Sequence, residues 1–344
     1  MTSAAWRNIQ ALRATPTGLA TTDPRRRTFA AALRQAEELA LAADAVSYEA
    51  KPLPLFYSLS QAGRAIAAAH LPDRFELEGH GIQFRLGNSK KVLTGTLNEQ
   101  GMAGGAFQDV ATATGSTAIE KPTQLGALWA ANPDLADVPI PPQLGGWPRA
   151  VGCGLGTRPP KSGNLPHITG STILTILDLP GETGADIAGV VRNYPSLAGT
   201  RSLKFGSVGD SYAEPHEQVD RRDDGRILLG RPAPAERSMK LSDSWDLQDG
   251  LYSVVEIDQS ASLYPDPNYV GWVIPEVAGG PAPSPLLLWW ALLFGLSHLA
   301  RYHPAAWTSA VDLDKSAEAA PLREVLDMAA EQVPVRVLAA LRGR

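Results

Sequence analysis

The chain has 344 residues, enough for one large domain or two smaller ones. Its 32 glycines and 28 prolines exclude a plain helical bundle or coiled coil over the whole length, because these residues interrupt helices. A formal net charge of −5 argues against a generally basic nucleic-acid-binding protein. The single cysteine, Cys153, excludes an intramolecular disulfide and a cysteine-based zinc site.

One uncharged run, residues 285–300, is the candidate membrane segment. It is shorter than the roughly 20 residues that span a bilayer, and it contains Gly295, Ser297 and His298. The first 13 residues have no apolar stretch of the signal-peptide type. We therefore expect a buried core helix, no membrane partner and a cytoplasmic protein.

Two helices are predicted near the N-terminus. Asp23 before Pro24 is a helix-start signal, and apolar residues recur at helical spacing over 25–45. A second helix follows Pro52, with apolar and small residues along one stripe, and ends before Pro72. The basic run 25–27 in the first turn is interpreted as solvated surface, with a phosphate or partner site as the alternative.

From residue 73 to about residue 280 the pattern changes to short alternating segments joined by connectors rich in proline and glycine. The segments predicted as strands are 75–78, 82–86, 91–97, 169–179, 226–229 and 250–258. A short helix is expected within 116–131, beginning near Lys121. This middle region is therefore predicted to be a β-containing insertion.

The last section returns to helical patterns. Residues 286–302 are apolar all round and should be buried, and 322–330 and 335–341 are amphipathic segments separated by Pro334. The expected fold class is α+β, with a predominantly α-helical core formed by residues 1–72 and 281–344. A β-containing, loop-rich insertion over 73–280 is expected between them.

Three catalytic signatures are absent or incomplete. The six histidines have no HExxH or HxH spacing and no accompanying carboxylate cluster, so we expect neither a metal nor a cofactor. The glycines of 152–157 resemble part of a phosphate-binding loop, but Pro159 and Pro160 stand where such a loop donates N–H groups. We interpret that segment as a connector. No Gly-x-Ser-x-Gly pentad occurs.

Two segments carry a family resemblance. Residues 54–66 read PLFYSLSQAGRAI and are followed by His70 and then by His80 between two glycines. Residues 296–307 read LSHLARYHPAAW. Together they resemble the YaaC-like family of bacterial proteins, which has a Pro-Leu-x-Phe-Tyr helix, a later His-Gly, and a terminal Leu-Ser-x-Leu-Ala-Arg-Tyr-x-Pro-x-x-Trp. The first segment also resembles the second helix of the HEPN superfamily.

The HEPN resemblance implies an HEPN-like core and a catalytic set. RNA-cleaving HEPN proteins carry an arginine followed, after four to six residues, by a histidine, and five residues separate Arg64 from His70. It implies that Arg64 stabilises the phosphate and that His70 or His80 moves protons, without a metal. Because an ideal helix places Arg64 and His70 about 120° apart, His70 must lie where the helix unwinds. A buried histidine that fixes its loop is the alternative for His80.

Substrate binding is assigned to Arg301, Tyr57 and His303, because arginine and histidine stand at the ends of two apolar helices. Arg301 ends the apolar C-terminal helix, where it could satisfy the last carbonyls. It could instead pair with a carboxylate such as Glu38, or hold an anion beside Arg64 if the two helices pack together.

The resemblance implies a bacterial conflict or antiphage-defence protein, acting as a metal-independent ribonuclease or a nucleotide-responsive effector. Its expected partners are RNA or a nucleotide, and either a second copy or another protein. The alternative is a non-catalytic binding or assembly module, which the apolar helices and eight tryptophans would also suit. A third interpretation is a small-molecule enzyme with its pocket in the glycine-rich middle. Convergence of Arg64, His80 and Arg301 in space would favour the first interpretation.

Overall fold

The computed structural model describes residues 3–73, 75–88, 91–100, 104–138, 140–157 and 271–343. Between 157 and 271 it also describes the short segments 167–168, 172–176, 193–194, 201–202, 227–231, 239–240 and 263–264. Contacts group the chain into two units. The first unit comprises residues 1–147 together with 277–344, and the second comprises residues 148–276.

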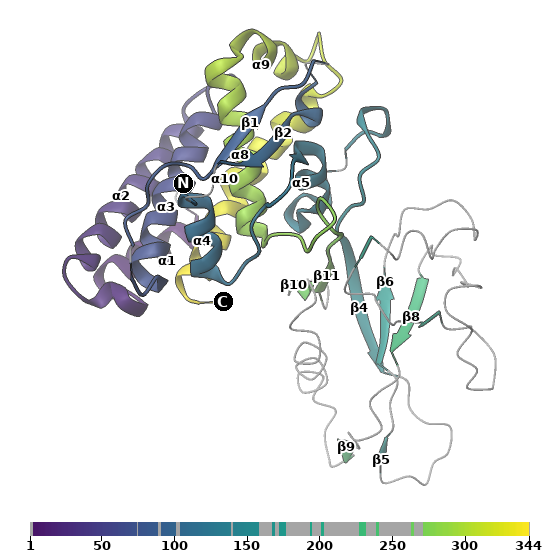
Figure 1. Cartoon of the computed structure of the whole chain (residues 1–344), viewed down its shortest axis with the longest axis horizontal. Coiled ribbons are helices and arrows are strands. Elements are labelled where there is room, and N and C mark those ends of the chain that lie inside the picture. The colour runs from purple at the N-terminus through teal and green to yellow at the C-terminus, as the bar shows by residue number, and fades with distance from the viewer. Residues whose placement is uncertain are drawn as a thin grey trace. The chain divides into compact units, whose positions relative to one another are not determined.

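The first unit is mostly helical (Figure 1). Its helices are α1 (Ala4–Ala14), α2 (Arg25–Asp44), α3 (Pro52–His70), α4 (Ala106–Thr114), α5 (Leu125–Ala131), α8 (Pro285–Tyr302), α9 (Pro304–Val311) and α10 (Ala319–Leu341). A three-stranded antiparallel sheet in the order β1–β2–β3 accompanies them, with β1 at Ile82–Arg85, β2 at Thr96–Glu99 and β3 at Thr123–Gln124. The predicted α+β class with a predominantly helical core is confirmed.

The centre of this unit is the pairing of α3 with α8. Helix α3 packs against α2 on one side and against α8 and α10 on others, so segments from both ends of the chain share one core. The indole of Trp290 lies directly on Gly63, where a Cβ atom would overlap the ring. Helix α8 is buried along almost its whole length, as its uninterrupted apolar sequence predicts. None of the helices described, α8 included, is long and apolar enough to cross a membrane.

Helix α2 begins differently from the prediction. Pro24 occupies the N-cap position and no side chain caps the helix, so Asp23 is not the cap. Arg25 instead closes the end of α3: its guanidinium donates to the carbonyls of Ala68, Leu71, Pro72 and Asp73. The same group lies 4.5 Å from the centre of the Phe75 ring. The other two arginines of the run, at positions 26 and 27, are exposed, as solvated surface predicts.

Helix α10 continues through Pro334, where two separate helices were predicted. A proline inside a helix costs about 3 kcal/mol, because it removes a backbone donor and crowds the preceding turn. Val333, Pro334 and Val337 are all buried in this helix. Burial of the apolar face on both sides of the proline offsets that cost, which local propensity does not reveal.

Residues 73–147, which were predicted as part of the insertion, group with the helical ends. The reason is their apolar content, because Phe84, Leu97, Phe107 and Leu128 are buried and their elements contact α8. Residues 75–78 form no strand, and 91–97 contains a 3-10 turn before β2 begins. The expected short helix is α5, whereas α1, α4 and α9 were not predicted.

The second unit contains antiparallel sheets. A six-stranded sheet has the order β10–β11–β4–β6–β8–β7, and β5 pairs with β9. The strands are β4 (Val151–Thr157), β5 (His167–Ile168), β6 (Thr172–Ile176), β7 (Arg201–Ser202), β8 (Ile227–Arg231), β9 (Met239–Lys240), β10 (Leu263–Tyr264) and β11 (Gly271–Val273). The glycine-rich segment 152–157 is part of β4, an extended strand. The strand predicted at 250–258 lies outside the described residues.

Candidate functional site

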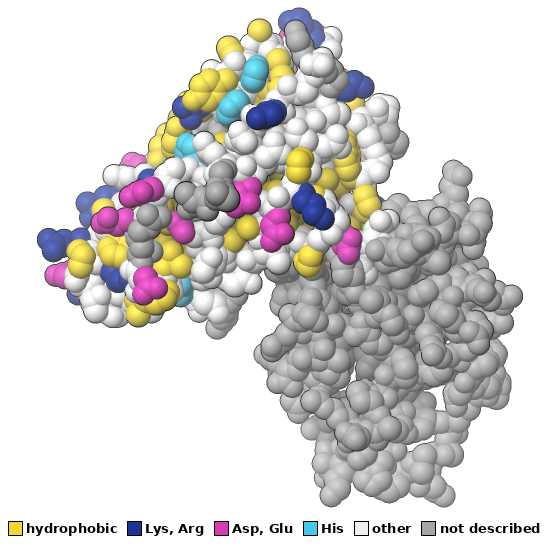
Figure 2. Space-filling model, viewed as in Figure 1, with side chains coloured by type: hydrophobic (Ala, Val, Ile, Leu, Met, Phe, Trp, Pro, Cys, Tyr) yellow, Lys and Arg dark blue, Asp and Glu magenta, His cyan; other side chains and the backbone are white. Residues whose placement is uncertain are grey.

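Histidine, arginine and tyrosine side chains gather where α3, the 79–81 turn and the end of α8 meet. Figure 2 shows histidines close together on the visible face of the first unit, with basic side chains beside them. We call this group the His/Arg cluster and define it by the residues whose interactions join them. It consists of Tyr57, Arg64, His80, His298, Arg301, Tyr302 and His303.

His80 lies in a turn between two glycines that both have positive φ, Gly79 at 61° and Gly81 at 78°. Its imidazole packs against the rings of Phe56 and Phe294, with centroid separations of 5.7 and 5.3 Å. Phe56 comes from α3 and Phe294 from α8, and both are buried. The two helices therefore provide an apolar surface against which the partly exposed imidazole packs.

The surroundings of His80 lower its pKa below the ordinary value of 6.5. Burial against the phenylalanines is the largest cause, and the positive charges of Arg301 and then Arg64 follow. Each of these disfavours the imidazolium. At neutral pH the ring is therefore an uncharged base close to two fixed cations, a combination suited to accepting a proton next to an anionic ligand.

Arg64 is held in place by the backbone of the segment that leads to His80. Its Nη1 donates to the carbonyl of Leu77 at 3.0 Å. Arg64 also lowers the pKa of His80, so α3 places a guanidinium near the 79–81 turn.

Arg301 is positioned by two tyrosines. Its Nη1 donates to the Tyr57 hydroxyl and its Nη2 to the Tyr302 hydroxyl, each at 2.9 Å. The guanidinium lies 4.9 Å from the centre of the Tyr302 ring. These hydroxyls accept from Arg301 in place of the helix carbonyls or Glu38. The Arg301 side chain is exposed, and a guanidinium carries five N–H donors, so the oriented fork keeps donors for an external anion.

His298 completes the cluster and was not among the predicted site residues. The centroid of its ring lies 4.6 Å from that of the Tyr302 ring and 5.9 Å from that of the His303 ring. Burial is the largest cause that lowers its pKa, followed by the charges of His303 and Arg301. Phe294, His298 and Tyr302 follow one another at four-residue spacing on α8. That spacing was the available sequence signal.

His70 is not brought to the cluster. It ends α3, six residues beyond Arg64 and thirteen beyond Tyr57, which is about 9 Å and about 20 Å along the helix by the usual rise per residue. Its imidazole lies beside Gly18, and its Nε2 is buried without a hydrogen-bond partner. Arg64 and Arg301 lie near enough to His80 for both positive charges to lower its pKa, whereas Arg64 donates to the carbonyl of Leu77 and His70 lies beside Gly18.

A sequence model of the YaaC-like proteins matches residues 10–139 and 226–341. The chain belongs to the YaaC-like family. No curated protein and no solved structure matches it. The matched ranges of this YaaC-like protein include α3, the 79–81 turn and α8, which together carry the His/Arg cluster.

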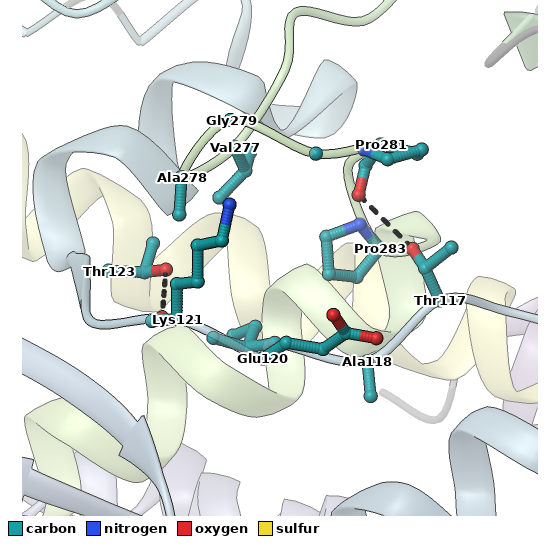
Figure 3. A pocket seen from close by; sticks show the side chains of 12 residues that line it. Thr117, Ala118, Glu120, Lys121, Thr123, Val277, Ala278, Gly279, Pro281 and Pro283 are labelled. Atoms are coloured by element: carbon teal, nitrogen blue, oxygen red, sulfur yellow. Dashed lines mark hydrogen bonds between the residues drawn. The ribbon is translucent and has the colours of Figure 1, made fainter.

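A separate cavity of about 130 Å³ lies between residues 117–123 and 277–283 (Figure 3). Lys121 reaches over it toward Gly279, and Glu120 lies on the same side. The Thr117 hydroxyl is used within the wall, because it donates to the carbonyl of Ala282 at 3.1 Å. With one cation beside a carboxylate and no histidine in its lining, this cavity is a weaker candidate for anion chemistry than the His/Arg cluster.

The residues that the structure describes include no group of three or more histidine, cysteine, aspartate or glutamate side chains able to hold a metal ion.

Proposed function

We propose that this YaaC-like protein binds RNA at the His/Arg cluster and cleaves its phosphodiester backbone without a metal. The observation that carries the proposal is the placement of His80, whose pKa is lowered by burial and by Arg301 and Arg64. A neutral imidazole accepts a proton, and two guanidinium groups nearby stabilise the negative charge that develops on a phosphate.

In the proposed reaction, His80 takes the proton of a ribose 2′-hydroxyl. The freed 2′ oxygen forms a bond to the adjacent phosphorus, and the bond from phosphorus to the 5′ oxygen breaks. The 5′ oxygen takes a proton from solvent, which leaves a 2′,3′-cyclic phosphate and a 5′-hydroxyl. Arg64 and Arg301 stabilise the negatively charged phosphorane between these two steps.

Single-stranded RNA fits the cluster better than a small inorganic anion does. Tyr302 is 58% exposed and adjoins the Arg301 fork. An exposed aromatic ring beside a phosphate-binding arginine suits stacking with an unpaired base, the usual mode of single-strand recognition. The net negative charge of the chain limits any such basic surface to a local patch.

The test is cleavage of a fluorescent single-stranded RNA by the purified protein in the presence of a chelator. We expect His80→Gln to abolish cleavage and Arg301→Gln to reduce it by at least tenfold. His70→Gln is the matched control and should cleave at the wild-type rate, because His70 lies outside the cluster. Wild-type cleavage by His80→Gln would contradict the proposal.

A nucleotide- or RNA-binding effector that does not cleave is the second candidate. The Arg301 fork, held by Tyr57 and Tyr302, would bind phosphate whether or not His80 transfers protons. Binding of RNA methylated at its 2′ oxygens, with no cleavage of unmodified RNA, would favour this function. Either activity would suit the bacterial conflict or antiphage role that the resemblance implies, in the cytoplasm and with a second copy or a protein partner.

The eight tryptophans give little support to the assembly-module alternative, because several of them are buried in the core. The indoles of Trp6, Trp129, Trp289, Trp290 and Trp307 are buried in the first unit. They are therefore used in the core and are not available for a partner surface.

A further inference from the structure

The turn that carries His80 is held by the start of helix α4. The backbone N–H of Phe107 donates to the carbonyl of His80 at 3.2 Å, which satisfies a donor at the helix N-terminus. The next carbonyl, that of Gly81, accepts from the backbone N–H of Gln100 and from Nε2 of Gln108, each at 2.9 Å. His80 therefore directly precedes Gly81, whose carbonyl accepts two hydrogen bonds.

Two glycines make this contact possible. A Cβ atom on Gly105, at the N-cap of α4, would overlap the backbone of Gly81. A Cβ atom on Gly81 would overlap the side-chain amide of Gln108. The amide of Gln108 therefore occupies space that the Cβ of any other residue at position 81 would fill.

The Gln108 side chain holds the Gly81 carbonyl although its own amide lacks some of its hydrogen bonds. Its Oε1 is buried and has no hydrogen-bond partner, and its second Nε2 contact, with the Glu99 carboxylate, is long at 3.5 Å. Buried polar atoms normally find partners. A side chain that tolerates an unpartnered oxygen while holding one backbone carbonyl is better explained by the turn it holds than by the stability of α4.

We propose that Gln108 is a positioning residue for His80: its amide fixes the Gly81 carbonyl and so directs the imidazole onto Phe56 and Phe294. The placement of the ring does not depend on what the cluster binds. Only the effect of Gln108 on RNA cleavage rests on the function proposed above.

The elements near the turn carry several charged and titratable side chains. These elements carry Arg64 on α3, His298 and Arg301 on α8, Arg85 on β1, Glu99 on β2, Asp109 on α4, and Glu76 and Glu78 in the preceding segment. Arg301 and Arg64 are the two charges that act on the pKa of His80. An imidazole that no longer packed against Phe56 and Phe294 would be more solvated and further from these cations.

The experiment compares wild type with Gln108→Met, which keeps the side-chain length but removes the donor. The readout is the NMR signal of the His80 imidazole, assigned with His80→Gln and followed from pH 5 to pH 8. We expect a changed chemical shift and a rise in the titration midpoint toward the value of an exposed histidine. Thr114→Ala is the matched control and should leave both unchanged, because the Thr114 hydroxyl donates only to carbonyls within α4.

A His80 signal and midpoint in folded Gln108→Met identical to those of wild type would overturn the proposal. If Gln108→Met fails to fold, Gln108→Asn, whose shorter amide cannot reach the carbonyl, gives the same comparison. Where RNA cleavage is measurable, we expect kcat to fall at least fivefold with little change in KM. A shifted His80 signal in a protein that never cleaves RNA would support the positioning role and reject the ribonuclease.

Discussion

Arg301 donates a hydrogen bond to the hydroxyl of Tyr57 at 2.9 Å, across 244 positions of the chain. Tyr57 lies in the second turn of α3, and Arg301 lies in the last turn of α8. The bond therefore joins the two helices at the surface, next to the buried rings that seat His80. It gives the cationic fork of Arg301 a defined orientation before any ligand binds.

We predict that Tyr57→Phe weakens RNA binding while changing stability little. An intramolecular hydrogen bond contributes about 0.5–1.5 kcal/mol, which corresponds to roughly a two- to tenfold change in affinity if the loss falls on the bound state. The measurement is a fluorescence-anisotropy titration with single-stranded RNA. Tyr48→Phe is the control, since Tyr48 donates to Asp327 at 2.8 Å away from the cluster. Equal affinities for Tyr57→Phe and wild type would contradict the role given to the hydroxyl.

The two histidines with lowered pKa make stability depend on pH. The folded protein binds fewer protons at His80 and His298 than the unfolded chain, whose histidines titrate near 6.5. The free energy of unfolding should therefore fall as the pH decreases below 6.5, and this loss should stop below the folded-state pKa values.

The double variant His80→Gln, His298→Gln should lose less stability than wild type over the same range. Urea unfolding at about pH 7.5, 6.5 and 5.5, on both sides of the ordinary histidine pKa, measures the difference. Comparing the two proteins cancels the contribution of Glu318, whose pKa is raised by burial and whose effect on stability has the opposite sign. Parallel pH profiles would show that these imidazoles are not desolvated in the folded state.

We predict that Gly63→Ala destabilises the protein by about 1–3 kcal/mol, the usual range for overpacking a filled core. The added methyl group would overlap the ring of Trp290, which is itself fully buried and cannot move aside. Gly87→Ala is the control, because Gly87 is exposed and has open space where its Cβ would lie. Thermal unfolding of both variants provides the test, and a Gly63→Ala protein as stable as Gly87→Ala would disprove the close approach of α3 and α8.

Removing the side chain of Arg25 should destabilise the protein by about 2 kcal/mol, because hydrogen bonds from charged donors contribute about 1.5–3 kcal/mol and part of this site is exposed. Arg25→Ala leaves the carbonyls at the end of α3 without their donor. Arg26→Ala removes the same charge from the same helix turn at an exposed position and should have little effect. Equal midpoints in urea unfolding would exclude the capping role of Arg25.

Local sequence patterns were sufficient to predict the helices α3 and α8. Apolar and small residues at helical spacing predict α3, and an unbroken apolar run predicts the buried α8, because helix periodicity and burial are properties of neighbouring residues. Arg64, His80 and Arg301 were predicted as site residues from the segments that resemble the YaaC-like and HEPN proteins and from the chemistry of arginine and histidine. Their grouping into one site was a hypothesis that depended on how the helices pack.

The predominantly helical core built from both ends of the chain follows from the sequence alone, since hydrophobic periodicity is encoded residue by residue. Three features become visible only in the packed molecule: α10 runs through Pro334, Arg25 caps α3, and the rings of His80 and His298 both lie against Phe294. Each of these depends on atoms from segments far apart in the chain. Burial, capping and electrostatic proximity between such segments arise only once the helices are packed.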